Sequence, residues 1–347
     1  MLIQGGLKVA KLTTKNDYGL FEIRFESIGG LGANLAGKML AEAGLKYENL
    51  NVASFSSYGS EKTGSPVKAF IRFAEPDTNI KVNSPIENPH VLVVFHENII
   101  KTMPVTLGCD ENTIYVVNSR KSPEELQDLL KIPKGKICTV DAIGIALEEK
   151  VKINGVILGA VANVVDFIEL DHIKGIFKDI IGKKYPALVD ANLKAIQRGY
   201  EEMKVADVAE NSKYEFKPFE LAAPKIGYEN QPMGGAVVNP ASMINKDLSA
   251  GRQGIIPVFK EDKCINCALC DFVCSDLCMV FKEDKDEKTG KDMMFMKGID
   301  YQYCKGCLKC VEVCPVNALV EEVESEVEVD KITVKLFSDK DIVQNHK

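Results

Sequence analysis

Eight of the eleven cysteines fall into two runs with the same spacing, C-x2-C-x2-C-x3-C, and these runs limit what the chain can fold into. The first run is Cys264, Cys267, Cys270 and Cys274, and the second is Cys304, Cys307, Cys310 and Cys314. A disulfide framework is typical of short secreted domains. This chain has 347 residues, and Met1 to Lys15 lacks the basic start and apolar core of a secretory leader. Structural zinc requires pairs of ligands and not two runs of four.

The spacing is instead typical of bacterial-type ferredoxin modules, in which three cysteines of a run bind one 4Fe-4S cluster and the fourth binds the other. We therefore predict two ligand sets. Set 1 is Cys264, Cys267, Cys270 and Cys314, and set 2 is Cys304, Cys307, Cys310 and Cys274. Cys278 lies four residues beyond the first run, and we interpret it as a packed thiol, with a ligand role as the alternative. Cys109 and Cys138 are expected to be buried thiols.

Length and composition indicate an ordinary globular protein of about two domains. Hydrophobic residues make up 46% of the chain and charged residues 27%. The net charge of −7 argues against a nucleic-acid partner, which favours a basic face. No apolar run approaches the roughly 20 residues that span a bilayer, so we expect no membrane contact. Oxygen-labile clusters without an export signal favour the cytoplasm, in an anaerobe.

Residues 21–204 alternate between short apolar runs and amphipathic segments, which predicts an α/β domain with a parallel-rich sheet and flanking helices. Strands are expected at 21–28, 91–95, 113–117 and 137–140, and helices at 33–43, from Pro123, after Asp141, at 157–168 and at 186–203. Ser122 and Pro123 together are typical of a helix start.

The rest of the chain divides into three parts. Prolines and glycines remove the periodicity of 205–254, which predicts an extended arm that packs on a partner subunit. Residues 255–325 are expected to form a small α+β two-cluster ferredoxin-like domain, with a β-hairpin insert at 279–298. Residues 326–347 are expected to form a C-terminal tail.

A glycine turn, Gly29-Gly30-Leu31-Gly32, follows the first predicted strand and precedes a helix. Unpaired N–H groups and the helix dipole at such a turn favour an anion, so Gly29, Gly30 and Gly32 are candidates for a phosphate surface. The alternative is a tight turn that lets strand and helix pack, because the third glycine of G-x-G-x-x-G is missing. The four histidines show no catalytic spacing, and no catalytic residue is assigned.

Segments along most of the chain, from Phe21 to Val323, resemble the gamma and delta subunits of a 2-oxoacid:ferredoxin oxidoreductase, fused into one polypeptide. The segments are the glycine turn, which is similar to G-G-Q-G; residues 57–67, similar to S-[FY]-G-x-E-x-R-G-[AG]-P-V; residues 154–160, similar to N-x-x-x-L-G-A; residues 192–200; and the lead-in at 234–246 and 256–264.

This resemblance implies a complex in which alpha- and beta-type partner subunits hold thiamine diphosphate and magnesium and decarboxylate a 2-oxo acid to a hydroxyalkyl-type adduct. Electrons then leave one at a time through iron–sulfur clusters to ferredoxin, and coenzyme A takes the acyl group in several members. The resemblance favours pyruvate and coenzyme A.

Two departures from the family pattern leave alternatives open. Leu31 replaces a glutamine, and Thr63 replaces an arginine, so polar capacity for coenzyme A is reduced. A coenzyme-A-independent oxalate oxidoreductase is one alternative, and a member acting on branched or aromatic 2-oxo acids is another. A ferredoxin-type carrier with a regulatory nucleotide-binding domain is a more distant one.

Overall fold

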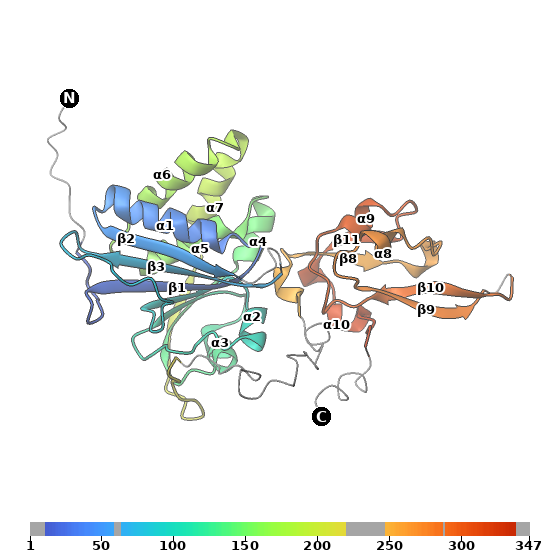
Figure 1. Cartoon of the computed structure of the whole chain (residues 1–347), viewed down its shortest axis with the longest axis horizontal. Helices are drawn as coiled ribbons and strands as arrows, with labels where there is room; N and C mark the ends of the chain where they lie inside the picture. The colour runs from blue at the N-terminus through green and yellow to red at the C-terminus, as the bar shows by residue number, and fades with distance from the viewer. Residues whose placement is uncertain (1–10, 59–63, 220–246, 287–288, 338–347) are drawn as a thin grey trace, which may run out of the picture. The chain divides into compact units, whose positions relative to one another are not determined.

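The computed structural model describes residues 11–58, 64–219, 247–286 and 289–337. The chain forms two compact units, 1–220 and 221–347 (Figure 1). Within the described ranges, no helix is both long and apolar enough to cross a membrane.

The first unit is built on a seven-stranded sheet with the order β2-β3-β1-β4-β5-β6-β7. The strands are β1 (Leu20–Ile28), β2 (Asn51–Tyr58), β3 (Pro66–Ala74), β4 (Val91–Val94), β5 (Ile114–Asn118), β6 (Gly135–Val140) and β7 (Lys204–Val208). β1, β4, β5 and β6 are parallel to one another, and β2, β3 and β7 pair antiparallel at the two flanks. The parallel-rich α/β sheet that the sequence predicted is therefore confirmed.

Helices cover both faces of this sheet (Figure 1). They are α1 (Ala33–Tyr47), α2 (Asn98–Thr102), α3 (Pro123–Leu130), α4 (Ala142–Glu148), α5 (Ile153–Val164), α6 (Leu170–Ile181) and α7 (Val189–Glu201). Figure 1 shows α1, α6 and α7 on one side of the strands and α2 and α3 on the other. Because both faces are covered, all four residues of β4 are fully buried, as expected for a central parallel strand.

The polar residues of β1 are buried as well. Arg72 on β3 contacts Glu22 at 2.6 Å, and Lys68 contacts Glu26 at 3.0 Å. Arg24 lies 3.2 Å from Glu26 and donates hydrogen bonds to the carbonyls of Ile86, Glu87, Val105 and Leu107. Removing one partner of such a buried pair is costly, so this face depends on complete pairing.

Local chemistry accounts for two helix starts that the sequence predicted. Ser122 accepts a hydrogen bond from the Glu125 N–H while the Glu125 side chain accepts one from the Ser122 N–H, which forms a capping box before α3. The Asp141 side chain accepts from the Gly144 N–H at the start of α4.

Several sequence expectations differ from the structure. β2, β3 and α6 were not predicted, and α5 begins four residues before the expected 157. The region expected at 186–203 is a short 3-10 turn, Pro186–Leu188, followed by α7. β7 lies mainly within the segment where no periodic element was expected; it is short and mostly exposed, and it pairs with β6 at the sheet edge. An exposed edge strand lacks the apolar alternation that identifies strands.

α5 and α7 pack closely because each carries a glycine at their contact. A Cβ atom on Gly159 of α5 would lie 1.9 Å from the Ile196 carbonyl oxygen, and one on Gly199 of α7 would lie 2.1 Å from the Val156 carbonyl oxygen. Gly155, on the same helix α5, has only ordinary contacts at 3.5 Å.

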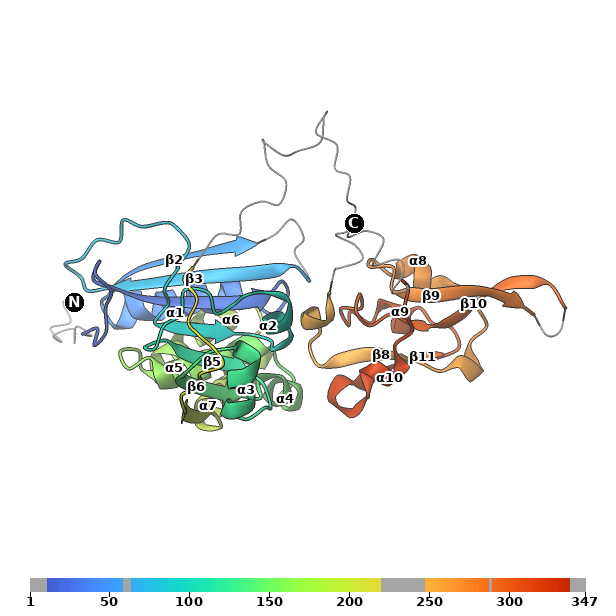
Figure 2. The same ribbon diagram turned by 90° about the horizontal axis from the view of Figure 1, so that it is seen from below.

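The second unit contains two antiparallel strand pairs and short helices. β8 (Ile255–Phe259) pairs with β11 (Leu319–Val323), and β9 (Met279–Lys285) pairs with β10 (Asp292–Ile299). The short helices are α8 (Leu269–Val273), α9 (Lys309–Glu312) and α10 (Val329–Ile332). Figure 2 shows β9 and β10 as a long two-stranded projection of this unit, which confirms the predicted hairpin.

The glycine contact yields a prediction about stability. Gly159→Ala should lower the free energy of unfolding by about 1–3 kcal/mol, because the new methyl group meets backbone that cannot move aside alone. Gly155→Ala is the matched control and should change it by less than about 1 kcal/mol, in the stabilising direction. Anaerobic denaturant titration of the full chain, followed by far-UV circular dichroism, measures both. Equal effects of the two variants would contradict the packing argument.

Candidate iron–sulfur site

The two cysteine runs have the same backbone geometry. Left-handed residues occur at matching positions, which are Asn266, Ala268 and Leu277 in the first run and Gly306, Leu308 and Asn317 in the second. Three of these are neither glycine nor asparagine, and such residues rarely adopt a positive φ without a structural requirement. Each run thus begins as a tight loop that carries its first two cysteines, and its third cysteine, Cys270 or Cys310, is buried in the short helix that follows, α8 or α9.

Strand pairing brings the end of each run beside the start of the other. β8 precedes Cys264 and pairs with β11, which follows Cys314. β9 follows Cys274 and pairs with β10, which precedes Cys304. The fourth cysteine of each run is therefore carried toward the other run.

The four cysteines of set 1 line one cavity. Cys264, Cys267 and Cys270 from the first run contribute to its wall together with Cys314 from the second. Apolar residues complete the lining, among them Phe259, Phe281 and Val316.

The cysteines of set 2 also lie near one another. Burial is the largest cause, and together with the neighbouring thiols Cys304, Cys307, Cys274 and Cys270 it raises the pKa of the Cys310 thiol to about 12. Three of these neighbours and Cys310 are the four residues of set 2, and the remaining neighbour, Cys270, belongs to set 1.

Backbone N–H groups converge on the fourth cysteine of each run. Ala318 donates to Cys314 Sγ at 3.2 Å, and Cys278 donates to Cys274 Sγ at 3.4 Å. Burial opposes ionisation of Cys314, but N–H groups from Val316 to Leu319 hold its pKa below the ordinary value. Such hydrogen bonds favour the thiolate, which is the form that binds metal.

Cys278 is the ninth cysteine of this unit and lies against set 2. Its side chain is 2% exposed, and its sulfur is 3.4 Å from Cys274 Sγ. The hydrogen bond between the two thiols lowers the pKa of Cys274 to about 6, against the effect of burial. Cys278 is packed, as expected, but it contacts a candidate ligand directly.

Arg252 is a participant that sequence reasoning missed. It is buried in the second unit and donates to the Cys304 carbonyl at 2.9 Å and to the carbonyl of Tyr301. Its guanidinium also pairs with Glu324, just after β11. It therefore fixes the start of the second run. Arg252 lies in the segment 205–254, which the sequence predicted to be an extended arm. A single arginine in such a segment does not indicate that it contacts a cysteine run.

The donors present fit 4Fe-4S clusters better than a single ion. Across the described residues, no group of three or more His, Cys, Asp or Glu side chains could hold one metal ion. Each thiolate around a cubane binds a different iron, so the four sulfurs lie farther apart than ligands of one ion. A mostly apolar, four-thiol cavity with N–H donors to sulfur suits such a cluster.

The glycine turn lies in the first unit, where β1 ends and α1 begins. The Gly29 N–H donates to the Ser65 carbonyl at 2.8 Å, and the Leu31 N–H donates to the Ile28 carbonyl at 3.3 Å. Gly32 has φ +82° and lies against Asn154. Two N–H groups of the turn are thus used inside the fold, and a phosphate surface at Gly29, Gly30 and Gly32 stays a prediction.

Leu31 does not face outward. Its side chain is 2% exposed, so it belongs to the core of the first unit. The interpretation that Leu31 removes polar capacity from a ligand surface is therefore wrong: a buried position gains nothing from an unpartnered amide. Thr63 lies outside the described residues.

The carboxyl ends of the parallel strands carry a polar network that the sequence did not suggest. Glu97, after β4, accepts from Lys121 at 2.6 Å and from Ser119, both after β5. Asp141, after β6, contacts Arg120 at 2.7 Å. Because these charged side chains pair with one another, we interpret the network as one that links the ends of β4, β5 and β6.

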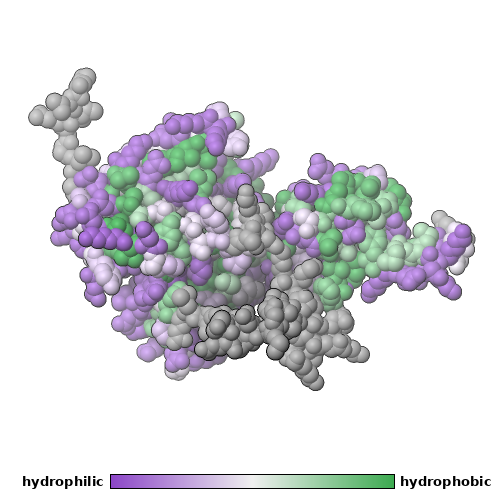
Figure 3. Space-filling model, viewed as in Figure 1, coloured by the Kyte–Doolittle hydropathy of each residue, from purple (hydrophilic) through white to green (hydrophobic). Residues whose placement is uncertain are grey.

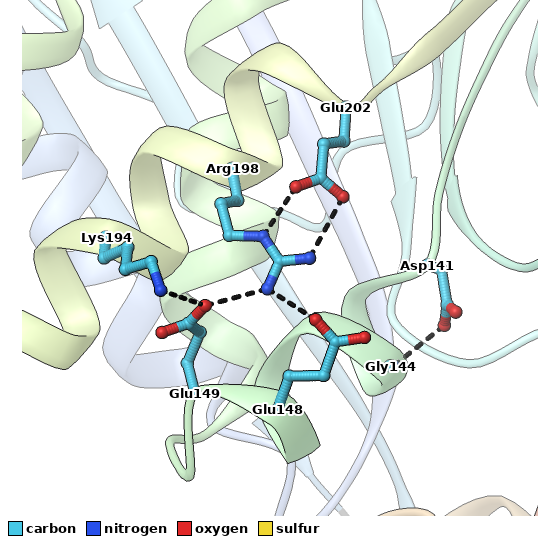
Figure 4. Close-up of polar contacts among 7 residues, drawn as sticks. All are labelled: Asp141, Gly144, Glu148, Glu149, Lys194, Arg198 and Glu202. Carbon is cyan, nitrogen blue, oxygen red and sulfur yellow. Dashed lines mark hydrogen bonds and ion pairs between the residues drawn. The ribbon is translucent and has the colours of Figure 1, made fainter.

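A second ion-pair network fastens α4 to α7 (Figure 4). Arg198 of α7 contacts Glu148 at 2.7 Å and Glu149 at 2.8 Å, and Lys194 also contacts Glu149. Hydrogen bonds from Lys194 and Arg198 lower the pKa of Glu149. The network holds helices together and includes none of the predicted site residues.

Comparisons with known proteins agree with both units. Residues 22–202 match the family model for pyruvate ferredoxin/flavodoxin oxidoreductase, and residues 263–318 match a 4Fe-4S dicluster domain. Pyruvate synthase subunit PorC of Thermotoga maritima is 40% identical over 190 residues, covering 54% of this chain and 96% of the relative. The common gamma subunit of pyruvate/ketoisovalerate oxidoreductases from Thermococcus kodakarensis is 36% identical over 54% of this chain and its own full length.

A crystal structure of pyruvate oxidoreductase subunit PORC from Thermotoga maritima is 35% identical, covers 54% of this chain and 99% of its own, and aligns with a TM-score of 0.47.

These matches define the class as an oxidoreductase with an iron–sulfur electron-transfer domain. The chain belongs to the pyruvate ferredoxin/flavodoxin oxidoreductase family. The dicluster match in the same polypeptide confirms that a gamma-type unit and a 4Fe-4S domain are fused.

The position of Cys278 yields a prediction about ligation. Cys278→Ala should retain about eight irons per chain, because set 2 already has four thiols. Iron analysis and electron paramagnetic resonance of the reduced protein measure this. Cys138→Ala, which removes a buried thiol of the first unit, is the control. Loss of about four irons from Cys278→Ala alone would make Cys278 a ligand.

Proposed function

We propose that this chain is the electron-transfer and assembly subunit of a thiamine-diphosphate-dependent 2-oxoacid:ferredoxin oxidoreductase. The observation that carries the proposal is the convergence of cysteines from both runs, because Cys314 shares a cavity with the three leading cysteines of the first run. A two-electron donor that supplies one-electron acceptors needs intermediate storage, and two adjacent four-thiol sites supply it.

The ligands in this proposal are the two sets predicted from spacing. Cys264, Cys267, Cys270 and Cys314 hold cluster 1, and Cys304, Cys307, Cys310 and Cys274 hold cluster 2. Each cluster accepts and releases one electron. Groups of this chain adjust the reduction potential of each cluster. The N–H donors to Cys274 and Cys314 stabilise negative charge on sulfur, and the buried Arg252 beside Cys304 adds positive charge.

The partners in this proposal are alpha- and beta-type subunits that bind thiamine diphosphate and magnesium, with ferredoxin as the acceptor. We further propose pyruvate as the 2-oxo acid and coenzyme A as the acyl acceptor. Relatives named pyruvate synthase subunits support this choice. The burial of Leu31 also supports it, because it removes one of the two sequence arguments against coenzyme A.

Ligand replacement tests the electron-transfer role. In the assembled complex, Cys267→Ser and Cys307→Ser should each damage one cluster and lower ferredoxin reduction by more than about ten-fold. Single-turnover release of carbon dioxide from the 2-oxo acid should persist, since that chemistry belongs to the partner subunits. Cys138→Ala is the control. Unchanged ferredoxin reduction in Cys267→Ser would refute the ligand assignment.

Substrate dependence tests the finer proposal. Viologen reduction by the anaerobically purified complex should require both pyruvate and coenzyme A. Branched-chain and aromatic 2-oxo acids and oxalate, each with and without coenzyme A, complete the panel. Turnover of oxalate without coenzyme A would overturn the pyruvate proposal while leaving the electron-transfer role intact.

A further inference from the structure

The two cysteine runs form an internal repeat, so each run serves as a reference for the other. They align residue for residue from their first cysteines, and their left-handed residues occur at matching positions. Their fourth cysteines, Cys274 and Cys314, are therefore equivalent. The residue four positions after each of these is Cys278 in the first run and Ala318 in the second. The comparison thus isolates what one side chain adds.

The backbone treats the two fourth cysteines alike. The Cys278 N–H donates to Cys274 Sγ at 3.4 Å, and the Ala318 N–H donates to Cys314 Sγ at 3.2 Å. The N–H group two residues after each fourth cysteine also donates to its sulfur. A difference between the two sulfurs in this corner of the repeat must therefore come from a side chain.

The side chain of Cys278 supplies such a difference. Its Sγ lies 3.4 Å from Cys274 Sγ, and it also forms a hydrogen bond with the thiol of Cys304. Cys274 and Cys304 both belong to set 2. The methyl group of Ala318 cannot donate a hydrogen bond, so the equivalent position offers none to Cys314. The additional contact therefore favours one cysteine set over the other.

Ligand chemistry decides which of these sulfurs carries the proton. A cysteine that binds iron does so as a thiolate, so Cys274 and Cys304 have no proton to donate when they serve as ligands. Cys278 is 2% exposed, and burial in apolar surroundings favours the neutral thiol. The S–H group of Cys278 is then the donor, and a thiolate sulfur is the acceptor.

The surroundings strengthen this hydrogen bond. Cys278 belongs to the hydrophobic core of the second unit, together with Met279, Ile299 and Leu319. Figure 3 shows hydrophobic residues gathered on the body of this unit, with hydrophilic residues toward the end of the β9–β10 hairpin. A hydrogen bond is electrostatically stronger in such a low-dielectric interior than in water. A weak donor such as a thiol can therefore have a measurable effect here.

We propose that Cys278 is a positioning residue that acts through Cys274: its S–H donates to the Cys274 thiolate and raises the reduction potential of cluster 2. The inference rests on the proposed function, which assigns the two clusters to this chain. Reduction adds one negative charge to a cluster, so a donor to its sulfur stabilises the reduced form more than the oxidised form. A repeat with one backbone thereby holds two clusters of unequal potential.

Removing the donor tests this assignment in the full chain, purified anaerobically and loaded with iron. Cys278→Ala should lower the equilibrium constant for reduction of cluster 2 about three- to ten-fold, the range that one hydrogen bond supplies. A ten-fold change corresponds to about 59 mV for a one-electron couple. A potentiometric titration followed by electron paramagnetic resonance measures this shift. An iron content of about eight per chain shows that the variant is fully loaded.

Ala318→Cys is the matched variant, because it places a thiol at the equivalent position of the second run. It should raise the equilibrium constant for reduction of cluster 1 by a similar factor, beside Cys314. The two variants should therefore shift different steps of the titration, and in opposite directions. If both variants shifted the same step, the assignment of Cys278 to cluster 2 would be wrong.

Cys278→Ser separates the hydrogen bond from packing. Serine keeps a donor at this position, so the potential of cluster 2 should lie closer to the wild-type value than in Cys278→Ala. A role in packing alone predicts the opposite sign for Cys278→Ala, because water that enters the vacated space also stabilises the reduced cluster. An unchanged or raised potential in a fully loaded Cys278→Ala variant would overturn the inference.

Iron content distinguishes this inference from the proposed function. Loss of about four irons from Cys278→Ala would make Cys278 a ligand and overturn its role as a donor. A wild-type chain that cannot be loaded with two reducible clusters would contradict the proposed function itself, and the inference would fail with it. A fully loaded chain in which only the predicted shifts are missing would overturn the inference alone.

Discussion

The second unit is organised around one predicted constraint: each proposed four-thiol site takes three cysteines from one run and one from the other. The two runs are separated by a hairpin, so local structure alone cannot close either site. The β8–β11 and β9–β10 pairs meet the constraint, because each joins the strand before one run to the strand after the other. Arg252 adds to this closure by holding the start of the second run to the end of β11. Cluster binding and strand pairing are therefore expected to stabilise each other.

The first unit is distinguished by charged side chains that are buried inside its sheet. β1 carries Glu22, Arg24 and Glu26, and all three are buried between layers of helices. Burial raises the pKa of Glu26, while Lys68 and Arg24 oppose that shift. Arg24 also holds the loops at 86–87 and 105–107 through their carbonyls, so pairing inside the sheet fixes loops outside it.

The cluster domain repeats one backbone with different side chains at several equivalent positions. The two runs share a backbone, so the difference between Phe272 and Glu312 at equivalent positions is a property of the surface alone. Cys278 breaks the repeat in the interior, since the equivalent residue is Ala318, and it places an additional thiol beside set 2 only.

The sequence by itself determined the features that repeat at short range. The cysteine spacing predicted a dicluster domain, the apolar runs predicted β1, β4, β5 and β6, and Ser122 with Pro123 predicted a helix start. Only the tertiary structure decided what depends on distant neighbours. β7 is a strand because β6 offers an edge to it, and Arg252 matters because it donates to the Cys304 carbonyl at the start of the second run. Leu31 is a core residue because the folded unit buries its side chain in the turn between β1 and α1. Spacing records ligands that are close in sequence, whereas burial and pairing arise only when separate segments meet.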